Sequence, residues 1–131
     1  MLESLSLEDI QKVTTAAAVS VIDLHGSNEK NQIDGAAVLA MRKALSQVQL
    51  TGTVVIGEGQ KDGAPMFAHG EKVGNLRGVE VDIAVDPIDG TSLVANGKAG
   101  AVSLIAFSPK NTMFNPEDNF YMYKLVTGHE S

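Results

Sequence analysis

The chain has 131 residues, which is enough for one compact domain with a hydrophobic core and too few for two comfortable ones. Its net charge of -6, with no run of Lys and Arg, argues against nucleic acid as a partner, and the absence of cysteine excludes disulfides and thiolate metal sites. The acidic N-terminus does not resemble a signal peptide, and no apolar stretch has membrane-spanning length. We therefore expect a cytoplasmic protein that does not contact membranes.

Two amphipathic helices are predicted in the first third of the chain. Ser6 and Asp9 form a capping-box variant, and apolar residues then recur at helical spacing until Gly26 provides a stop. A polar loop is expected to lead to Asp34, after which residues 36–48 are rich in good helix formers with apolar residues on one side. In this position Asp34 is by default the N-cap of the second helix.

Three strands are predicted after the second helix, which Gly52 is expected to end. Residues 53–56 are all β-branched and run into a glycine-rich loop, whereas residues 79–85 alternate apolar and polar side chains. Residues 101–107 form the third strand, and a short helix is expected between the last two strands. Helices followed by strands favour an α+β fold, with two N-terminal helices packed on a mixed sheet, and we expect a single domain over residues 1–131.

The motif DPIDGT, residues 86–91, directly follows the second predicted strand and is expected to end it. Asp86 and Asp89, made rigid by the intervening proline, can converge on a hard divalent cation such as Mg²⁺ or Mn²⁺. Gly90 allows the backbone to approach a phosphate closely, and Thr91 adds a hydroxyl at the same place. A plain surface turn is the alternative, because Asp, Pro and Gly are common turn formers. The strand end and the threonine favour metal and phosphate chemistry.

Two further acids are candidates for the same site. Glu58 lies between glycines in the loop after the first strand; such a residue is more often solvated, but a two-metal site requires a second acidic loop at a strand end. Asp34 becomes a plausible fourth carboxylate if Glu58, Asp86 and Asp89 already gather metal ions. The three histidines have no ligand spacing, and the sequence contains no serine-nucleophile or nucleotide-binding motif.

Five segments that follow one another along the chain resemble class II fructose-1,6-bisphosphatases, including the bifunctional fructose-1,6-/sedoheptulose-1,7-bisphosphatases. DPIDGT is shared more widely, with lithium-sensitive phosphatases and inositol monophosphatases, whereas IGEG-x-x-D-x-APM is specific to this family. The resemblance implies the N-terminal part of a layered α/β sugar-phosphatase fold. The segments are KNQIDGAAVLAMRKAL, GTVVIGEGQKDGAPM, GEKVG, VDIAVDPIDGTSLVANGK and FYMYKL.

The resemblance implies a hydrolase that removes the 1-phosphate of fructose 1,6-bisphosphate, in gluconeogenesis or the Calvin cycle, with sedoheptulose 1,7-bisphosphate as a second candidate substrate. Carried over by position, Asp34 and Glu58 bind one Mn²⁺ or Mg²⁺ ion, and Asp86 and Asp89 bind another. Many members of the family have Glu where this chain has Gln60 and Asp89. The second difference keeps the negative charge but shortens its reach.

The same resemblance assigns the substrate contacts and the catalytic groups. Asp89, Gly90, Thr91 and Tyr121 are expected to meet the sugar phosphate. Thr91, paired with Asp62, is expected to position or activate the attacking water.

Members of this family are much longer than this chain, which leaves other functions open. One alternative is a catalytically inactive, truncated paralogue that acts as a binding or regulatory partner of a full-length phosphatase, and another is a gene fragment without its own role. The expected partners are a sugar bisphosphate and either further copies of the chain, in a homo-oligomer, or a full-length homologue.

Overall fold

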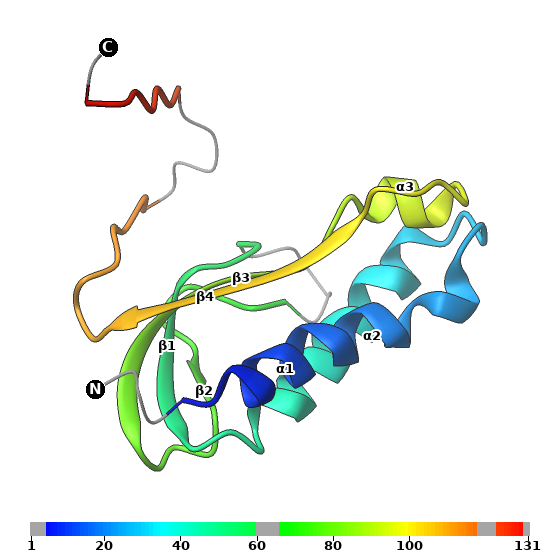
Figure 1. The fold of residues 1–131 in the computed structure, drawn as a ribbon. Helices are drawn as coiled ribbons and strands as arrows, with labels where there is room; N and C mark the ends of the chain where they lie inside the picture. The colour runs from blue at the N-terminus through cyan, green and yellow to red at the C-terminus, as the bar shows by residue number, and fades with distance from the viewer. Residues whose placement is uncertain (1–4, 60–65, 118–122, 130–131) are drawn as a thin grey trace.

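The computed structural model describes residues 5–59, 66–117 and 123–129. Its four-stranded sheet has the order β2-β1-β3-β4, in which β1 and β3 are parallel and the other two pairs are antiparallel. Helices α1 and α2 lie together on one side of this sheet (Figure 1), which confirms the predicted α+β class. The elements are α1 (Leu7–Ser20), η2 (Ile22–Leu24), α2 (Lys30–Leu45), β1 (Leu50–Ile56), β2 (Lys72–Val73), β3 (Val79–Asp89), α3 (Thr91–Ala95) and β4 (Val102–Pro109).

The first helix begins as predicted and ends earlier. The backbone N–H of Asp9 donates to the Ser6 hydroxyl oxygen at 3.0 Å, which confirms the cap. The α-helix ends at Ser20, and a short 3₁₀ turn, η2, continues it. Gly26 then adopts a left-handed conformation with φ of 81°, so the predicted stop is correct although the helix before it is not continuous.

The second helix begins at Lys30, so the prediction of Asp34 as its N-cap is wrong. The capping position is Glu29, whose side chain makes no capping hydrogen bond. The extra turn forms because Ile33 is fully buried and extends the apolar stripe of the helix toward its N-terminus. Asp34 is therefore held inside a helix, with its carboxylate available for a tertiary contact.

Gly52 was predicted to end the second helix, but it lies within β1. Helix α2 already ends at Leu45, and β1 starts at Leu50. A Cβ atom at position 52 would lie 2.4 Å from Cδ1 of Ile83 on the neighbouring strand. Close packing of the strand against the core thus explains the glycine. The predicted strand was too short because it included only the β-branched residues 53–56.

The hydrophobic core lies between the helices and the sheet. Val81, Ile83 and Val85 of β3 alternate toward the helices and are buried. The opposite side of the sheet is not covered by a helix in the described residues (Figure 1). We call the central part of this side the open face; it comprises Ala84 and Asp86 on β3, and Val102, Leu104 and Ala106 on β4.

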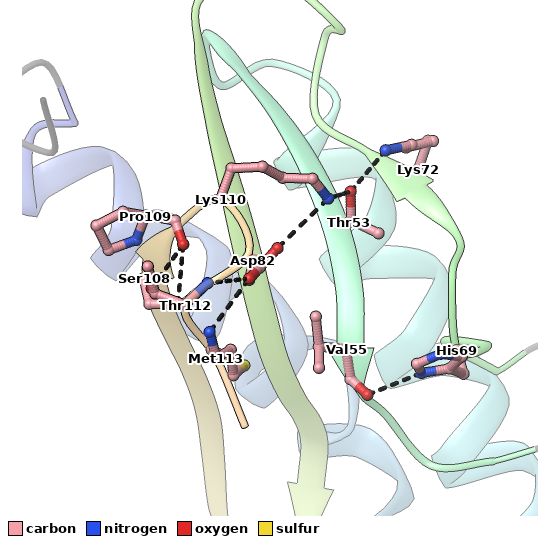
Figure 2. A network of polar contacts seen from close by, with 10 residues as sticks. All are labelled: Thr53, Val55, His69, Lys72, Asp82, Ser108, Pro109, Lys110, Thr112 and Met113. Atoms are coloured by element: carbon pink, nitrogen blue, oxygen red, sulfur yellow. Dashed lines mark hydrogen bonds and ion pairs between the residues drawn. The ribbon is translucent and has the colours of Figure 1, made fainter. Parts of the chain in front are cut away.

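One end of this uncovered side carries a polar network around Asp82, which is only 2% exposed (Figure 2). The backbone N–H groups of Thr112 and Met113 donate to its Oδ2 at 3.0 and 3.2 Å. Lys110 Nζ lies 3.4 Å from Oδ1 and also donates to the Thr53 hydroxyl at 2.8 Å. Burial opposes ionisation of Asp82, but these hydrogen bonds outweigh it and hold its pKa below the usual value. The chain after β4 is therefore fastened back onto the sheet.

Candidate functional site

The DPIDGT motif lies where β3 meets α3. The strand was predicted to end at Asp86, but it continues to Asp89. Its pairing with β4 shifts register between these two residues. Pro87 has no N–H for the strand ladder, so an irregularity within the strand replaces the expected end. Gly90 follows with φ of 95° and turns the chain into α3.

Thr91 joins this motif to the second helix. Its hydroxyl donates to Oδ1 of Asp34 at 2.7 Å and lies 3.1 Å from the carbonyl oxygen of Ile88. A threonine hydroxyl has only one proton to donate. The shorter contact, to the charged carboxylate, is therefore the stronger hydrogen bond. Two predicted site residues, distant in sequence, therefore meet in the structure.

Asp86 shows that the acids lie within electrostatic range of one another. Burial raises the pKa of its carboxyl, the negative charges of Asp89 and Asp34 raise it further, and the backbone N–H of Ile88 partly offsets these effects. Asp34 and Asp86 are half-buried, whereas Asp89 is exposed. A cation at this place would relieve both the desolvation and the repulsion.

Glu58 follows the strand that runs beside β3. Because β1 and β3 are parallel and Ile56 pairs with Ala84, both Glu58 and Asp86 lie two residues beyond a paired position. The carboxyl ends of these strands meet at the same edge of the sheet. One carboxylate oxygen of Glu58, Oε2, is shielded from solvent.

The predicted site is thus assembled in part. Among the described residues, no group of three or more His, Cys, Asp or Glu side chains is close enough to form a ready-made metal site. Two of the predicted residues, Asp62 and Tyr121, lie outside the described residues. The structure joins Asp34 and Thr91 by a hydrogen bond, and the charges of Asp89 and Asp34 act on Asp86.

Arg42 fastens the far end of the loop that begins with Glu58, and sequence reasoning did not identify it. Its Nε and Nη2 donate to the two carboxylate oxygens of Glu71 at 3.0 and 3.1 Å, and Nη2 also donates to the carbonyl oxygen of Met66 at 3.0 Å. The guanidinium carbon lies 4.9 Å from the centre of the Phe67 ring. No local pattern pairs a helix residue with a loop acid so far along the chain, so only the folded structure shows this contact.

Gly57 closes the same loop at its near end. A Cβ atom at this position would lie 2.2 Å from the carbonyl oxygen of Phe67, whose side chain is fully buried. We expect Gly57→Ala to destabilise the chain by about 1–3 kcal/mol through overpacking, and to displace Glu58. Urea unfolding measures the first effect, and the rise in melting temperature caused by Mn²⁺ measures the second. Gly128→Ala, where no atom lies within 4 Å of the added Cβ, is the control and should change neither.

Residues 3–131 match a family described as bacterial fructose-1,6-bisphosphatase, glpX-encoded. The chain is similar to fructose-1,6-bisphosphatase 2 class 2 of Escherichia coli (strain K12), with 50% identity over 115 residues, which are 88% of this chain and 36% of that protein. It is 49% identical over 120 residues to fructose-1,6-bisphosphatase 1 class 2 of the same strain and to fructose-1,6-bisphosphatase class 2 of Shigella flexneri, covering 92% of this chain and 35% of each relative.

The chain therefore spans about a third of the length of these relatives. No helix in the described ranges is long and apolar enough to cross a bilayer. The match to the family extends over nearly the whole chain, at both the N-terminal helices and the acidic strand ends. This chain belongs to the glpX-encoded bacterial fructose-1,6-bisphosphatase family.

Proposed function

We propose that the chain supplies the acidic, metal-binding part of a phosphatase that hydrolyses the 1-phosphate of fructose 1,6-bisphosphate. The observation that supports this proposal is the hydrogen bond from the Thr91 hydroxyl to Asp34, together with the effect of the Asp89 and Asp34 charges on the half-buried Asp86. The names of the E. coli relatives support the substrate. The chain spans about a third of the length of these relatives. The complete activity is therefore proposed for an enzyme that also contains the rest of that length.

The donor set fits a hard divalent cation. Carboxylate oxygens are the ligands that Mg²⁺ and Mn²⁺ prefer, and burial together with the charges of Asp89 and Asp34 raises the pKa of Asp86. In the proposal Asp34 and Glu58 hold one cation, and Asp86 and Asp89 hold another. When bound, such ions polarise the phosphoryl group and neutralise charge on the leaving oxygen.

The residues of the chain have distinct roles in the proposed reaction. Asp34 accepts a hydrogen bond from the Thr91 hydroxyl, which leaves the lone pairs of the Thr91 oxygen able to accept a hydrogen bond from a water molecule. Thr91 is thus suited to orient the attacking water; Asp62, the acid expected to pair with it, lies outside the described residues. The left-handed Gly90 has no side chain to obstruct a phosphate that approaches the turn. Asp62 and Tyr121 remain proposed contacts to the water and to the sugar phosphate.

Phosphate release from fructose 1,6-bisphosphate, with Mn²⁺ or Mg²⁺, tests the proposal. The enzyme for this assay is a chimera in which residues 1–131 replace the matching third of E. coli fructose-1,6-bisphosphatase 1 class 2. We expect metal-dependent release, and a parallel assay with sedoheptulose 1,7-bisphosphate determines whether the second substrate is used. Thr91→Val should reduce the rate by about 100-fold or more, the scale of a lost water-positioning contact, whereas Thr14→Val on α1 should leave it unchanged. An active Thr91→Val chimera would show that Thr91 has no such role.

The alternative function is that of a binding protein rather than an enzyme. The chain would then act as an inactive binding or regulatory partner of a full-length phosphatase. Addition of the isolated chain to the full-length E. coli enzyme distinguishes the two functions. An inactive chimera, together with a changed rate of the full-length enzyme, would support the regulatory function instead.

A further inference from the structure

A pocket of about 430 Å³ lies between the end of the first helix and the segment that joins α3 to β4. Pockets that bind small molecules have volumes of about 300–1,000 Å³ and mostly apolar walls. The walls here include Val21 and Val94, which are buried, and Ile22, which is 63% exposed. None of the proposed metal ligands is among the described residues that line this pocket, so it is separate from the site proposed above.

Two polar groups of the pocket lack partners among the described residues. Oγ of Ser103 is shielded from solvent and has no hydrogen-bond partner there. Ser103 lies between Val102 and Leu104 on β4, so it points away from the open face and toward the helices. Lys98 is exposed and makes no ion pair with a described acid. A ligand with a negative charge and hydrogen-bond acceptors would supply what both groups lack.

We propose that this pocket, which we call the α3 pocket, binds a small amphipathic anion in which a carboxylate is attached to an apolar body. The apolar walls would bury the body of the ligand, while Lys98 attracts its charge and the Ser103 hydroxyl donates to it. A cationic ligand would be repelled by Lys98. A purely apolar ligand would leave the shielded hydroxyl without an acceptor.

The α3 pocket shares a wall with the short helix that begins at Thr91. Val94 of this helix lines the pocket, and its carbonyl oxygen accepts from the backbone N–H of Gly26 at 2.8 Å. The other end of the helix is held by the hydrogen bond from Thr91 to Asp34. An occupant packed on Val94 would therefore favour the arrangement in which these two residues meet. We expect the anion and Mn²⁺ to strengthen each other's binding; this coupling, unlike the binding itself, rests on the proposed metal site.

The probe for the pocket is 4-phenylbutyrate, with 4-phenylbutanol and 4-phenylbutylamine as neutral and cationic ligands of similar shape. Titration of the 131-residue chain, followed by amide chemical shifts in two-dimensional NMR spectra, gives both affinity and location. We expect the carboxylate to bind at least about tenfold more tightly than the amine. The largest shift changes should lie in residues 18–25 and 94–103, which contain most of the lining of the pocket.

Two substitutions test the polar groups. Lys98→Glu should abolish the preference for the carboxylate over the amine, whereas Lys43→Glu, at another exposed lysine, on α2, is the control and should preserve it. Ser103→Ala should weaken 4-phenylbutyrate binding at least about threefold. It should not lower the melting temperature, because the hydroxyl has no described partner to lose.

Calorimetry with and without Mn²⁺ measures the coupling. The affinity for 4-phenylbutyrate should rise several-fold when Mn²⁺ is bound, and the affinity for Mn²⁺ should rise by the same factor when 4-phenylbutyrate is bound. Asp86→Asn should remove this enhancement and leave 4-phenylbutyrate binding in the absence of metal unchanged.

Four results would overturn the inference. These are the absence of saturable 4-phenylbutyrate binding, equal affinities for the three ligands, shift changes on the open face instead of at the α3 pocket, and a preference for the carboxylate that survives Lys98→Glu. Equal 4-phenylbutyrate affinities with and without bound Mn²⁺ would overturn the coupling. A chain that binds 4-phenylbutyrate as expected but does not bind Mn²⁺ would contradict only the proposed function.

Discussion

Replacement of Asp86 by asparagine is expected to raise the melting temperature of the metal-free chain and to abolish its stabilisation by Mn²⁺. Burial and the charges of Asp89 and Asp34 raise the pKa of Asp86 in the folded state. Ionised Asp86 at neutral pH therefore favours the unfolded chain, and a neutral side chain of the same size removes that penalty. The gain in stability and the loss of metal binding have the same cause.

The pH dependence of this group has a definite sign. A carboxyl whose folded pKa is raised binds its proton more tightly in the folded chain, so its contribution to stability falls as the pH rises from the unfolded pKa through the raised folded pKa. Protons and Mn²⁺ compete for the same oxygens, so the increase in melting temperature caused by Mn²⁺ should diminish as the pH falls through that raised pKa.

Thermal melts with and without Mn²⁺, over a pH series, measure both effects of Asp86→Asn. Asp23→Asn is the control, because Asp23 is an exposed acid on η2 and is not among the groups that shift the pKa of Asp86. If Asp86→Asn left the Mn²⁺-induced shift unchanged, the cation would bind elsewhere and the proposed ligands would be wrong.

Asp82→Ala is expected to cause the largest loss of stability among single substitutions of the described polar residues, on the order of 3 kcal/mol. The substitution leaves the amides of Thr112 and Met113 without their acceptor and leaves the half-buried ammonium of Lys110 without its counter-charge. Urea unfolding at neutral pH measures the loss. Glu80→Ala, two residues earlier on the same strand and exposed, should change stability by much less.

Asp82 also predicts how the chain responds to acid. Its pKa is lowered in the folded state, so its contribution to stability is complete above the unfolded pKa and is lost as the pH falls through the folded pKa. The difference in stability between the wild-type chain and Asp82→Ala should therefore shrink in acid. A difference that stayed constant down to the lowest pH would mean that the carboxylate charge is not what holds residues 110–113.

The sequence was sufficient for features governed by local chemistry. The Ser6 cap and the short helix between the last two strands follow from capping preferences and local sequence pattern, and β4 overlaps the strand predicted over residues 101–107. The α+β class followed from the order of helical and strand patterns. The acids Glu58, Asp86 and Asp89 were identifiable because each follows a predicted strand closely in the sequence.

Features that depend on tertiary packing were predicted wrongly or missed. Helix α2 starts early because Ile33 packs in the core, and Gly52 belongs to a strand because Ile83 occupies the space beside it. Strand β2 has only two residues and no pattern of its own. The contacts of Arg42 and Asp82 join distant segments, so no spacing rule could indicate them.

The parallel pairing of β1 with β3 also bears on the order of events during folding. Helices α1 and α2 arise from neighbouring residues, whereas Leu50 must find Val79 across the whole intervening loop before the two strands can align. Closing such a loop delays the nonlocal pairing relative to helix formation. The edge that carries Glu58 and Asp86 therefore forms late, and a nascent chain has its helical layer before the proposed metal ligands come together.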